Sequence, residues 1–195
     1  MGKVRKRPTH VHENRIDMTA YEELTNKATM GSSMDIGIVG GGLSGMFAAR
    51  LLSDLGHNVT VWDKGSRIGG RMTGWKTDEG SKIHLGARAL DSIPSWMDRF
   101  VDEWARLGLV SREGGSLIPD APLPELLKYL SEGSSVCLGT KVTGLELMEE
   151  GIRVTKESDG DGEIYRYDRV IVAVPVEQAS EIASDLDIDI DGESI

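Results

Sequence analysis

A glycine-rich turn between an apolar run and a helical segment restricts this chain to few folds. Residues 36–39 are a short apolar run of the kind buried in a parallel sheet. The hexapeptide at 40–45 (GGGLSG) follows, and apolar residues then recur at helical spacing from Leu43 to Leu55. Gly56 is typical of a helix C-terminus, and residues 59–62 form a second apolar run. This order predicts a right-handed βαβ unit.

The glycine spacing at 40–45 has a physical meaning at each position. Gly40 permits a tight turn, Gly42 lets a pyrophosphate approach the backbone, and Gly45 allows the helix to pack closely on the strand. The helix N-terminus offers unpaired N–H groups to phosphates. Asp63 lies 18 residues after Gly45, where its carboxylate can accept hydrogen bonds from ribose hydroxyls. The pattern predicts a dinucleotide-binding unit.

A second glycine loop directly after Asp63 distinguishes between two kinds of dinucleotide. Residues 64–71 (KGSRIGGR) place paired glycines between Arg67 and Arg71. The backbone of such a loop can wrap a diphosphate while the guanidinium groups offset its charge. A simple NAD-linked enzyme does not need this second phosphate-facing loop, so the loop disfavours that alternative.

The segment after this loop has helical spacing. Residues 94–132 are expected to be helical: Pro94 is placed to begin one helix through about Leu107, and Pro122 or Pro124 to begin another through Leu130. Four large apolar residues recur at helical intervals in the first of these helices, and we expect them to face the core. They are Trp96, Phe100, Trp104 and Leu107.

After Ser135 the pattern changes to strands. Short runs separated by turn residues predict an antiparallel meander. Residues 170–174 are apolar without alternation, which predicts a central parallel strand that ends at Pro175 and is followed by a helix from about Val176. The expected strands of the meander region are 136–138, 142–148, 151–156 and 163–167.

With these motifs in place, the sequence resembles the two-dinucleotide-binding-domain flavoproteins, in particular the renalase-like branch of the amine oxidase superfamily. The match covers about residues 34–183: the two glycine loops, Asp63, the meander and the V-A-V-P at 172–175. The resemblance implies an α/β fold, a Rossmann-like FAD-binding parallel sheet with an antiparallel β-meander and a small helical insertion. It also implies FAD as the cofactor.

The resemblance assigns roles to residues that match the family motifs. The first glycine loop would hold the pyrophosphate, Asp63 and Lys64 the adenosine ribose, and the second loop the pyrophosphate and flavin. The backbone of Val142 would meet adenine. The residues expected to bind the cofactor are Gly40, Gly42, Leu43, Ser44, Gly45, Asp63, Lys64, Arg67, Gly70, Arg71, Met72 and Val142.

The sequence departs from the renalase-like pattern in two places. Those proteins usually carry Asp-His-Gly-Ala after the second loop, whereas residues 84–87 here are His-Leu-Gly-Ala, so the role of the acidic residue is not carried over. His84 is either a flavin-site group or a structural histidine. The family also ends with a segment that completes the flavin site, and residues 176–195 do not resemble it.

We expect three regions along the chain. Residues 1–33 form a flexible arm, with a true start at Met34 as the alternative, residues 34–183 form the FAD-binding domain with a helical insertion at about 93–133, and residues 184–195 are an acidic, apparently truncated end. His10 and His12 in the arm lack further ligands at suitable spacing, so no metal site is expected.

The amino-acid composition indicates which partners and which cellular compartment to expect. The net charge of −10 argues against a nucleic-acid-binding surface, and no apolar stretch reaches the length of a membrane span. Cys137 is the only cysteine, which fits a reducing, cytoplasmic setting, and its apolar neighbours suit a core residue. We expect a small-molecule substrate; the oligomeric state is left open.

The sequence thus predicts an FAD-dependent oxidoreductase, or the N-terminal part of one. Its flavin would accept a hydride from an amine or a reduced nicotinamide-type donor and would be reoxidised by oxygen. No Ser/His/Asp set or Cys/His cluster marks a catalytic acid or base, so none is named. The alternative is a truncated, non-catalytic dinucleotide-binding module that needs a partner or a missing C-terminal half.

Overall fold

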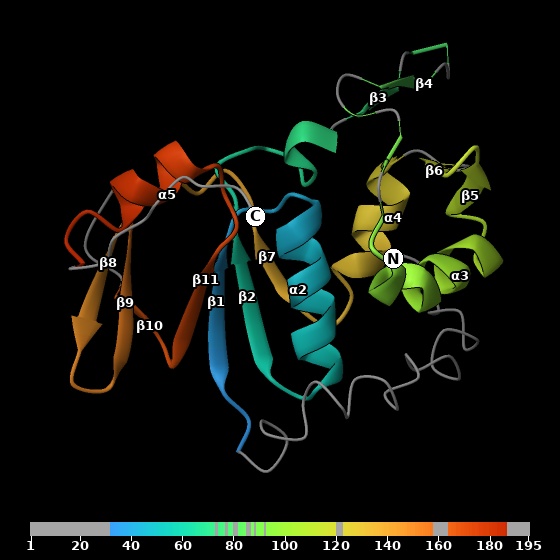
Figure 1. Cartoon of the computed structure of the whole chain (residues 1–195). Helices are drawn as coiled ribbons and strands as arrows, with labels where there is room; N and C mark the ends of the chain where they lie inside the picture. Colours follow the sequence, from blue (N-terminus) through green and yellow to red (C-terminus); the bar gives the residue numbers. More distant parts are fainter. Residues whose placement is uncertain are drawn as a thin grey trace, which may run out of the picture. The chain divides into compact units, whose positions relative to one another are not determined.

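The computed structural model describes residues 32–72, 74–76, 78–79, 82–84, 87, 89–91, 93–119, 123–157 and 164–186. From Ser33 onward these residues belong to one compact unit, which Figure 1 shows. The expectations for His10, His12 and the end of the chain fall outside the described residues, as does the side chain of His84.

A four-stranded parallel sheet forms the centre of the unit (Figure 1). The strand order is β11-β1-β2-β7, with β1 at Asp35–Val39, β2 at Asn58–Trp62, β7 at Ser135–Cys137 and β11 at Arg169–Val172. In the register, Ile38 of β1 lies between Val61 of β2 and Ile171 of β11. The parallel arrangement brings the carboxyl ends of all four strands to the same edge of the sheet.

Helix α2 (Leu43–Asp54) covers one face of this sheet, as the βαβ pattern predicts. Met46 and Ala49 of the helix are fully buried, as are Ile38 and Val61 of the sheet. The helix ends at Leu55, and Gly56 takes a positive φ of 89° that lets the chain turn back into β2.

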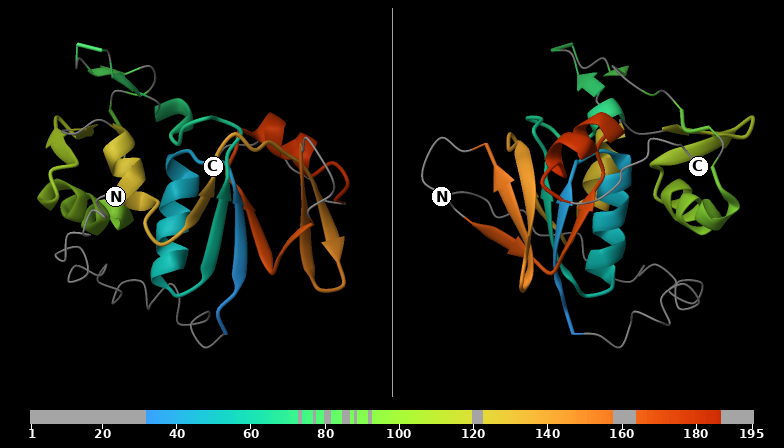
Figure 2. Two further views of the ribbon diagram at one scale, coloured as in Figure 1. Left: turned by 180° about the vertical axis from the view of Figure 1, so that it is seen from behind. Right: turned by 60° about the vertical axis from the view of Figure 1, so that its left-hand side comes forward.

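The opposite face of the sheet is covered by the antiparallel meander and by helix α5 (Val176–Ile182) (Figures 1 and 2). The meander has the order β10-β9-β8, with β8 at Val142–Met148, β9 at Gly151–Lys156 and β10 at Tyr165–Tyr167. Between the layers lies an apolar core that includes Val39, Trp62, Val142, Leu145, Val154, Tyr167 and Ile182.

A buried hydrogen bond fixes how the meander sits on the sheet. The Trp62 indole N–H donates to the Tyr167 hydroxyl over 3.0 Å. The Tyr167 ring lies against Gly37 of β1, where an added Cβ would approach the ring to 2.8 Å. Burial raises the pKa of the Tyr167 phenol above its ordinary value. A side chain at position 37 would clash with the Tyr167 ring, so only glycine fits there.

The insertion between β2 and β7 packs on the α2 side of the sheet. It contains two helices, α3 (Asp98–Arg106) and α4 (Leu123–Leu130), and α3 is preceded by a 3₁₀ turn, η2 (Ser95–Met97). Phe47 of α2 meets Phe100 edge-on at a ring-centroid distance of 4.9 Å and Trp104 at 6.0 Å.

A polar network joins the three helices beside these rings. The Arg50 side chain donates to Asp54 and to the carbonyl of Tyr129, and it stacks over the Tyr129 ring. The Tyr129 hydroxyl donates to the buried carboxylate of Glu103 over 2.7 Å. Burial, and after it this bond to Glu103, raises the pKa of Tyr129 well above its ordinary value.

The expectation of a helical segment over 94–132 is wrong in its middle. Strands β5 (Val110–Glu113) and β6 (Ser116–Pro119) form an antiparallel hairpin there, and Gly114 and Gly115 both take positive φ in its turn. A glycine pair between two short runs is a hairpin signal that competed with the helical spacing on either side. A second short hairpin, β3 (Gly74–Lys76) with β4 (Lys82–His84), was also not predicted.

Two strands and two apolar side chains differ from expectation. The strand expected at 136–138 is β7, which pairs in parallel with β2 and does not belong to the meander, because three apolar residues carry no alternation that could separate the two. Among the described strands, β11 is at an edge of the sheet and not in its centre. Trp96 and Leu107 are largely exposed, so only Phe100 and Trp104 of the expected stripe are in the core.

The buried network predicts an unequal response to two substitutions in the insertion. Tyr129→Phe removes the donor to the buried Glu103 carboxylate, and we expect the free energy of unfolding to fall by about 1–3 kcal/mol. Arg112→Gln, which breaks an exposed ion pair with Asp98, should leave it nearly unchanged. Urea unfolding measures both. Equal effects of the two changes would contradict this account of the insertion.

Candidate functional site

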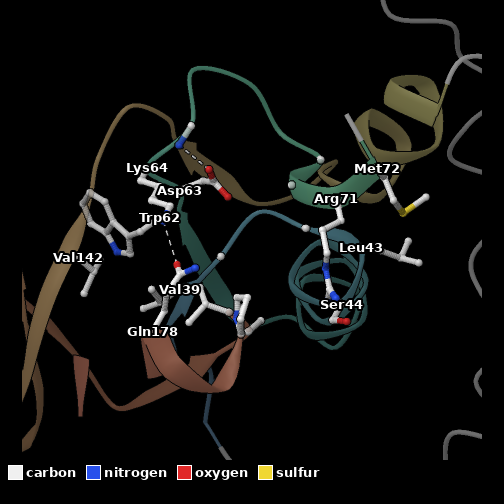
Figure 3. A pocket seen from close by; sticks show the side chains of 18 of the residues that line it. Val39, Leu43, Ser44, Trp62, Asp63, Lys64, Arg71, Met72, Val142 and Gln178 are labelled. Atoms are coloured by element: carbon white, nitrogen blue, oxygen red, sulfur yellow. Dashed lines mark hydrogen bonds between the residues drawn. The ribbon is translucent and has the colours of Figure 1, made fainter. Parts of the chain in front are cut away.

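A cavity of about 660 Å³ lies at the carboxyl edge of the parallel sheet, where a crevice is expected in open α/β folds. Figure 3 shows Asp63 near its centre, Trp62 and Val142 toward one end, and Leu43 and Met72 toward the other. The volume is in the range of pockets that bind a cofactor or small ligand.

The first wall of the cavity is the turn between β1 and α2. Gly40 has a φ of 111°, and its N–H donates to the carbonyl of Trp62 over 2.8 Å. Gly45 is packed so tightly on this turn that an added Cβ would lie 1.9 Å from the Gly40 carbonyl oxygen. Gly42, by contrast, has nothing within 4 Å of an added Cβ. Gly40 therefore forms the tight turn and Gly45 allows the close packing, as their spacing predicts. Gly42 leaves open space over the turn, as its position in the spacing predicts, and we call this space the cradle.

The N-terminus of α2 faces this cradle without a side-chain cap. Gly42 is the N-cap residue, and no side chain caps the helix there. No acidic residue lies in the first turn of the helix. The first intrahelical bond runs from the Met46 N–H to the Gly42 carbonyl, so the N–H groups of Leu43 and Ser44 precede the helical ladder. An anion placed over Gly42 would meet these N–H groups and the positive end of the helix dipole.

The second wall is the loop from Lys64 to Met72, and it is bonded directly to the first. The Gly69 N–H donates to the Gly41 carbonyl over 2.8 Å, and an added Cβ on Gly70 would lie 3.6 Å from the Cα of Gly42. The two glycine loops are therefore in direct contact, and residues of both line the cavity. The exposed side chain of Arg71 extends into the cavity beside Ser44 (Figure 3).

Asp63 connects the two loops. One of its carboxylate oxygens accepts from the Gly41 N–H and the other from the Gly65 N–H, each over 2.6 Å. A carboxylate oxygen has two lone pairs, so each retains capacity for a further donor. The carboxylate lines the cavity, where a vicinal diol could donate to both oxygens.

The structure brings the expected cofactor residues together. Eleven of the twelve line the cavity, and the twelfth, Gly45, lies directly beneath the turn that forms its wall. Contact of each with a cofactor stays a prediction. Sequence reasoning missed part of the wall: Val39, Trp62, Gly65, Gly69, Ala87, Leu90, Thr140, Lys141, Ala173, Val174, Pro175, Gln178, Glu181 and Ile182.

Some of these residues carried a usable signal. Ala173, Val174 and Pro175 follow an expected parallel strand, and the carboxyl ends of parallel strands share one edge, so they could have been placed at the site. Gln178 and Glu181 lie on α5, and nothing in their sequence context indicates that this helix turns one face to the cavity.

Comparison with known proteins agrees with this geometry. Residues 38–104 match the family described as NAD(P)-binding Rossmann-like domain, and residues 94–187 match the family described as flavin containing amine oxidoreductase. These matches make the chain similar to the flavin amine oxidase superfamily. FAD is the cofactor that this similarity indicates. The narrower likeness to the renalase-like branch stays a prediction.

Individual relatives agree with this similarity. An L-amino-acid oxidase of Siganus canaliculatus is 44% identical over 62 residues, which is 31% of this chain and 12% of that protein. A 4,4'-diapolycopen-4-al dehydrogenase of Metabacillus indicus is 29% identical over 134 residues, 66% of this chain and 24% of that protein. The chain thus spans about an eighth to a quarter of the length of these relatives.

A solved structure has the same fold. An oxidoreductase from Methanosarcina mazei superposes with a TM-score of 0.56 at 15% identity, covering 78% of this chain and 62% of that one.

Within the described part of the chain, no helix is long and apolar enough to cross a membrane, and no cluster of three metal-ligating side chains is found.

The residues of the cavity fit the FAD group. The open space over Gly42 and the uncapped α2 N-terminus suit a pyrophosphate. The remaining acceptor capacity of Asp63 suits a ribose diol, and Arg71 supplies a guanidinium to offset phosphate charge.

The two glycines predict separable effects. Gly42→Ala adds a methyl group in open space, so the melting temperature should stay close to wild type while FAD affinity falls at least about tenfold, because the methyl occupies the cradle. Gly45→Ala forces a methyl group against the Gly40 carbonyl, so it should lower the melting temperature itself. Thermal unfolding and FAD titration measure the two. A Gly42→Ala protein that binds FAD as wild type does would refute the cradle.

Proposed function

We propose that this chain is the FAD-binding part of an oxidoreductase that oxidises a small amine or a reduced nicotinamide-type donor. Bound FAD would supply the redox chemistry, accepting a hydride from the donor and returning the electrons to dioxygen. The observation that carries the proposal is the hydrogen bond between the two glycine loops, which brings both loops to one cavity beside Asp63.

In this proposal the chain's own residues bind and orient the cofactor. The N–H groups at the start of α2 donate to the pyrophosphate, and Arg71 offsets its charge from the facing loop. Asp63 accepts the ribose hydroxyls and so fixes the position of the dinucleotide along the cavity. Leu43 and Met72 form an apolar end that excludes water from the redox-active ring (Figure 3).

A second candidate is a dinucleotide-binding module without turnover of its own. It is favoured by the apolar end of the cavity, where the described lining residues Leu43, Met72, Ala87 and Leu90 include no acid or base. Catalysis at that end would then need groups from elsewhere. For either candidate we propose a small-molecule ligand, a cytoplasmic setting consistent with the single cysteine, and no nucleic-acid partner, given the net charge of −10.

The visible spectrum of the purified protein tests the proposal. We expect flavin absorption after purification or after addition of FAD, and bleaching of that absorption when a donor amine or reduced nicotinamide is added without oxygen. A flavin spectrum that no donor bleaches would favour the non-catalytic module, and a protein that takes up no FAD would contradict both candidates.

Asp63 provides the matching residue test. Asp63→Asn keeps one acceptor oxygen but loses the charge and the second acceptor, so FAD affinity should fall by about tenfold to a hundredfold. Asp168→Asn is the control, because Asp168 also accepts a backbone N–H at the end of a strand but lies outside the cavity lining. FAD titration followed by flavin fluorescence measures both affinities. Equal losses for the two variants would count against a ribose role for Asp63.

A further inference from the structure

One side-chain hydrogen bond links two walls of the cavity. The Lys64 ammonium donates to the side-chain oxygen of Gln178 over 3.0 Å, and both residues line the cavity (Figure 3). Lys64 directly follows Asp63 on the second glycine loop, whereas Gln178 lies 114 residues further along the chain, in the first turn of α5. The bond therefore joins the loop after β2 to the helix after β11.

Lys64 bonds to a neutral amide and not to a carboxylate of the same cavity. The neighbouring Asp63 and the cavity-lining Glu181 both carry carboxylates, yet neither forms one of the ion pairs found among the described residues. A charged pair between Lys64 and Asp63 would occupy the lone pairs that a ribose diol needs. By holding the ammonium on a neutral amide, Gln178 keeps the Asp63 carboxylate open toward the cavity.

The two sides of this bond differ in mobility. Gln178 is held on a helix whose C-terminal residues, Ile182 and Ala183, are buried in the core against the meander. Lys64 is exposed and carries its charge on a flexible four-carbon stem. The bond is thus opened by movement of the Lys64 side chain, while the amide that receives it stays in place.

We infer that the Lys64–Gln178 bond is a clasp that closes over the adenosine end of bound FAD and slows its release, with Gln178 as a cofactor-retaining residue. The inference rests on the proposed function, because it takes FAD as the occupant of the cavity. The clasp opens to admit the dinucleotide and forms again over it. Because the clasp must open both for entry and for release, its loss should speed dissociation and association alike.

The experiment is a double-mutant cycle on the FAD dissociation rate. The protein and its Gln178→Ala, Lys64→Met and doubly substituted variants are loaded with FAD and diluted, and release is followed by the recovery of free-flavin fluorescence. Each single change should speed dissociation roughly fivefold, and the double variant should dissociate no faster than the single ones, because both remove the same bond. Gln178→Asn, which keeps the amide but shortens its reach, should behave as Gln178→Ala does.

Glu177→Gln is the matched control, since Glu177 is the exposed neighbour on the same helix turn and lies outside the cavity lining. It should leave the dissociation rate unchanged, and circular dichroism should show the same fold for every variant. Multiplicative effects of the two single changes would show independent contacts with FAD and overturn the clasp. Slower release in either single variant would also overturn it, because the bond would then obstruct the site. Failure of the wild-type protein to bind FAD would instead overturn the proposed function itself.

Discussion

The contact between Gly45 and the carbonyl of Gly40 governs the whole site. An added Cβ would lie 1.9 Å from that oxygen, so α2 can start where it does only because residue 45 has no side chain. This closeness aims the helix N-terminus at the carboxyl edge of the sheet. The Gly41 N–H is held by Asp63 and the Gly41 carbonyl by the Gly69 N–H, so the same turn positions the acid and the second glycine loop. Without the tight turn, none of these groups would share a cavity.

The two layers on either side of the sheet stabilise this arrangement in different ways. On the meander side, the Trp62–Tyr167 hydrogen bond and the packing of Tyr167 on Gly37 leave a single way for the meander to dock. On the α2 side, Arg50, Tyr129 and Glu103 join the insertion to the helix that begins at the cradle. Residues of α5 and of the meander line one side of the cavity, and the N-terminus of α2 lines another. The packing of both layers on the sheet therefore sets the width of the cavity.

Much of this could be predicted from residues whose chemistry leaves few options. The glycines of 40–45 and the apolar runs at 36–39 and 59–62 specified the βαβ unit, and the bounds expected for β8 and β9 are those observed. The likeness to flavin amine oxidases and the expected cofactor followed from the two loops taken with Asp63, the meander and the V-A-V-P at 172–175. The roles of the individual cofactor residues remain predictions, although the structure gathers them around one cavity.

The features that could not be predicted from the sequence depend on contacts between distant segments of the chain. A three-residue strand such as β7 has no alternation to show which sheet it joins, and the glycine pair at 114–115 lies between two segments with helical spacing. Gln178 could not be assigned to the site, because only the packing of α5 on the core turns that residue toward Lys64.

A crystal structure of the protein grown with FAD tests the central claim most directly. The account predicts a pyrophosphate between Gly42 and Arg71, with both ribose hydroxyls on the Asp63 carboxylate and the adenine near Val142. A dinucleotide bound elsewhere, or one whose pyrophosphate touches only one of the two glycine loops, would contradict it.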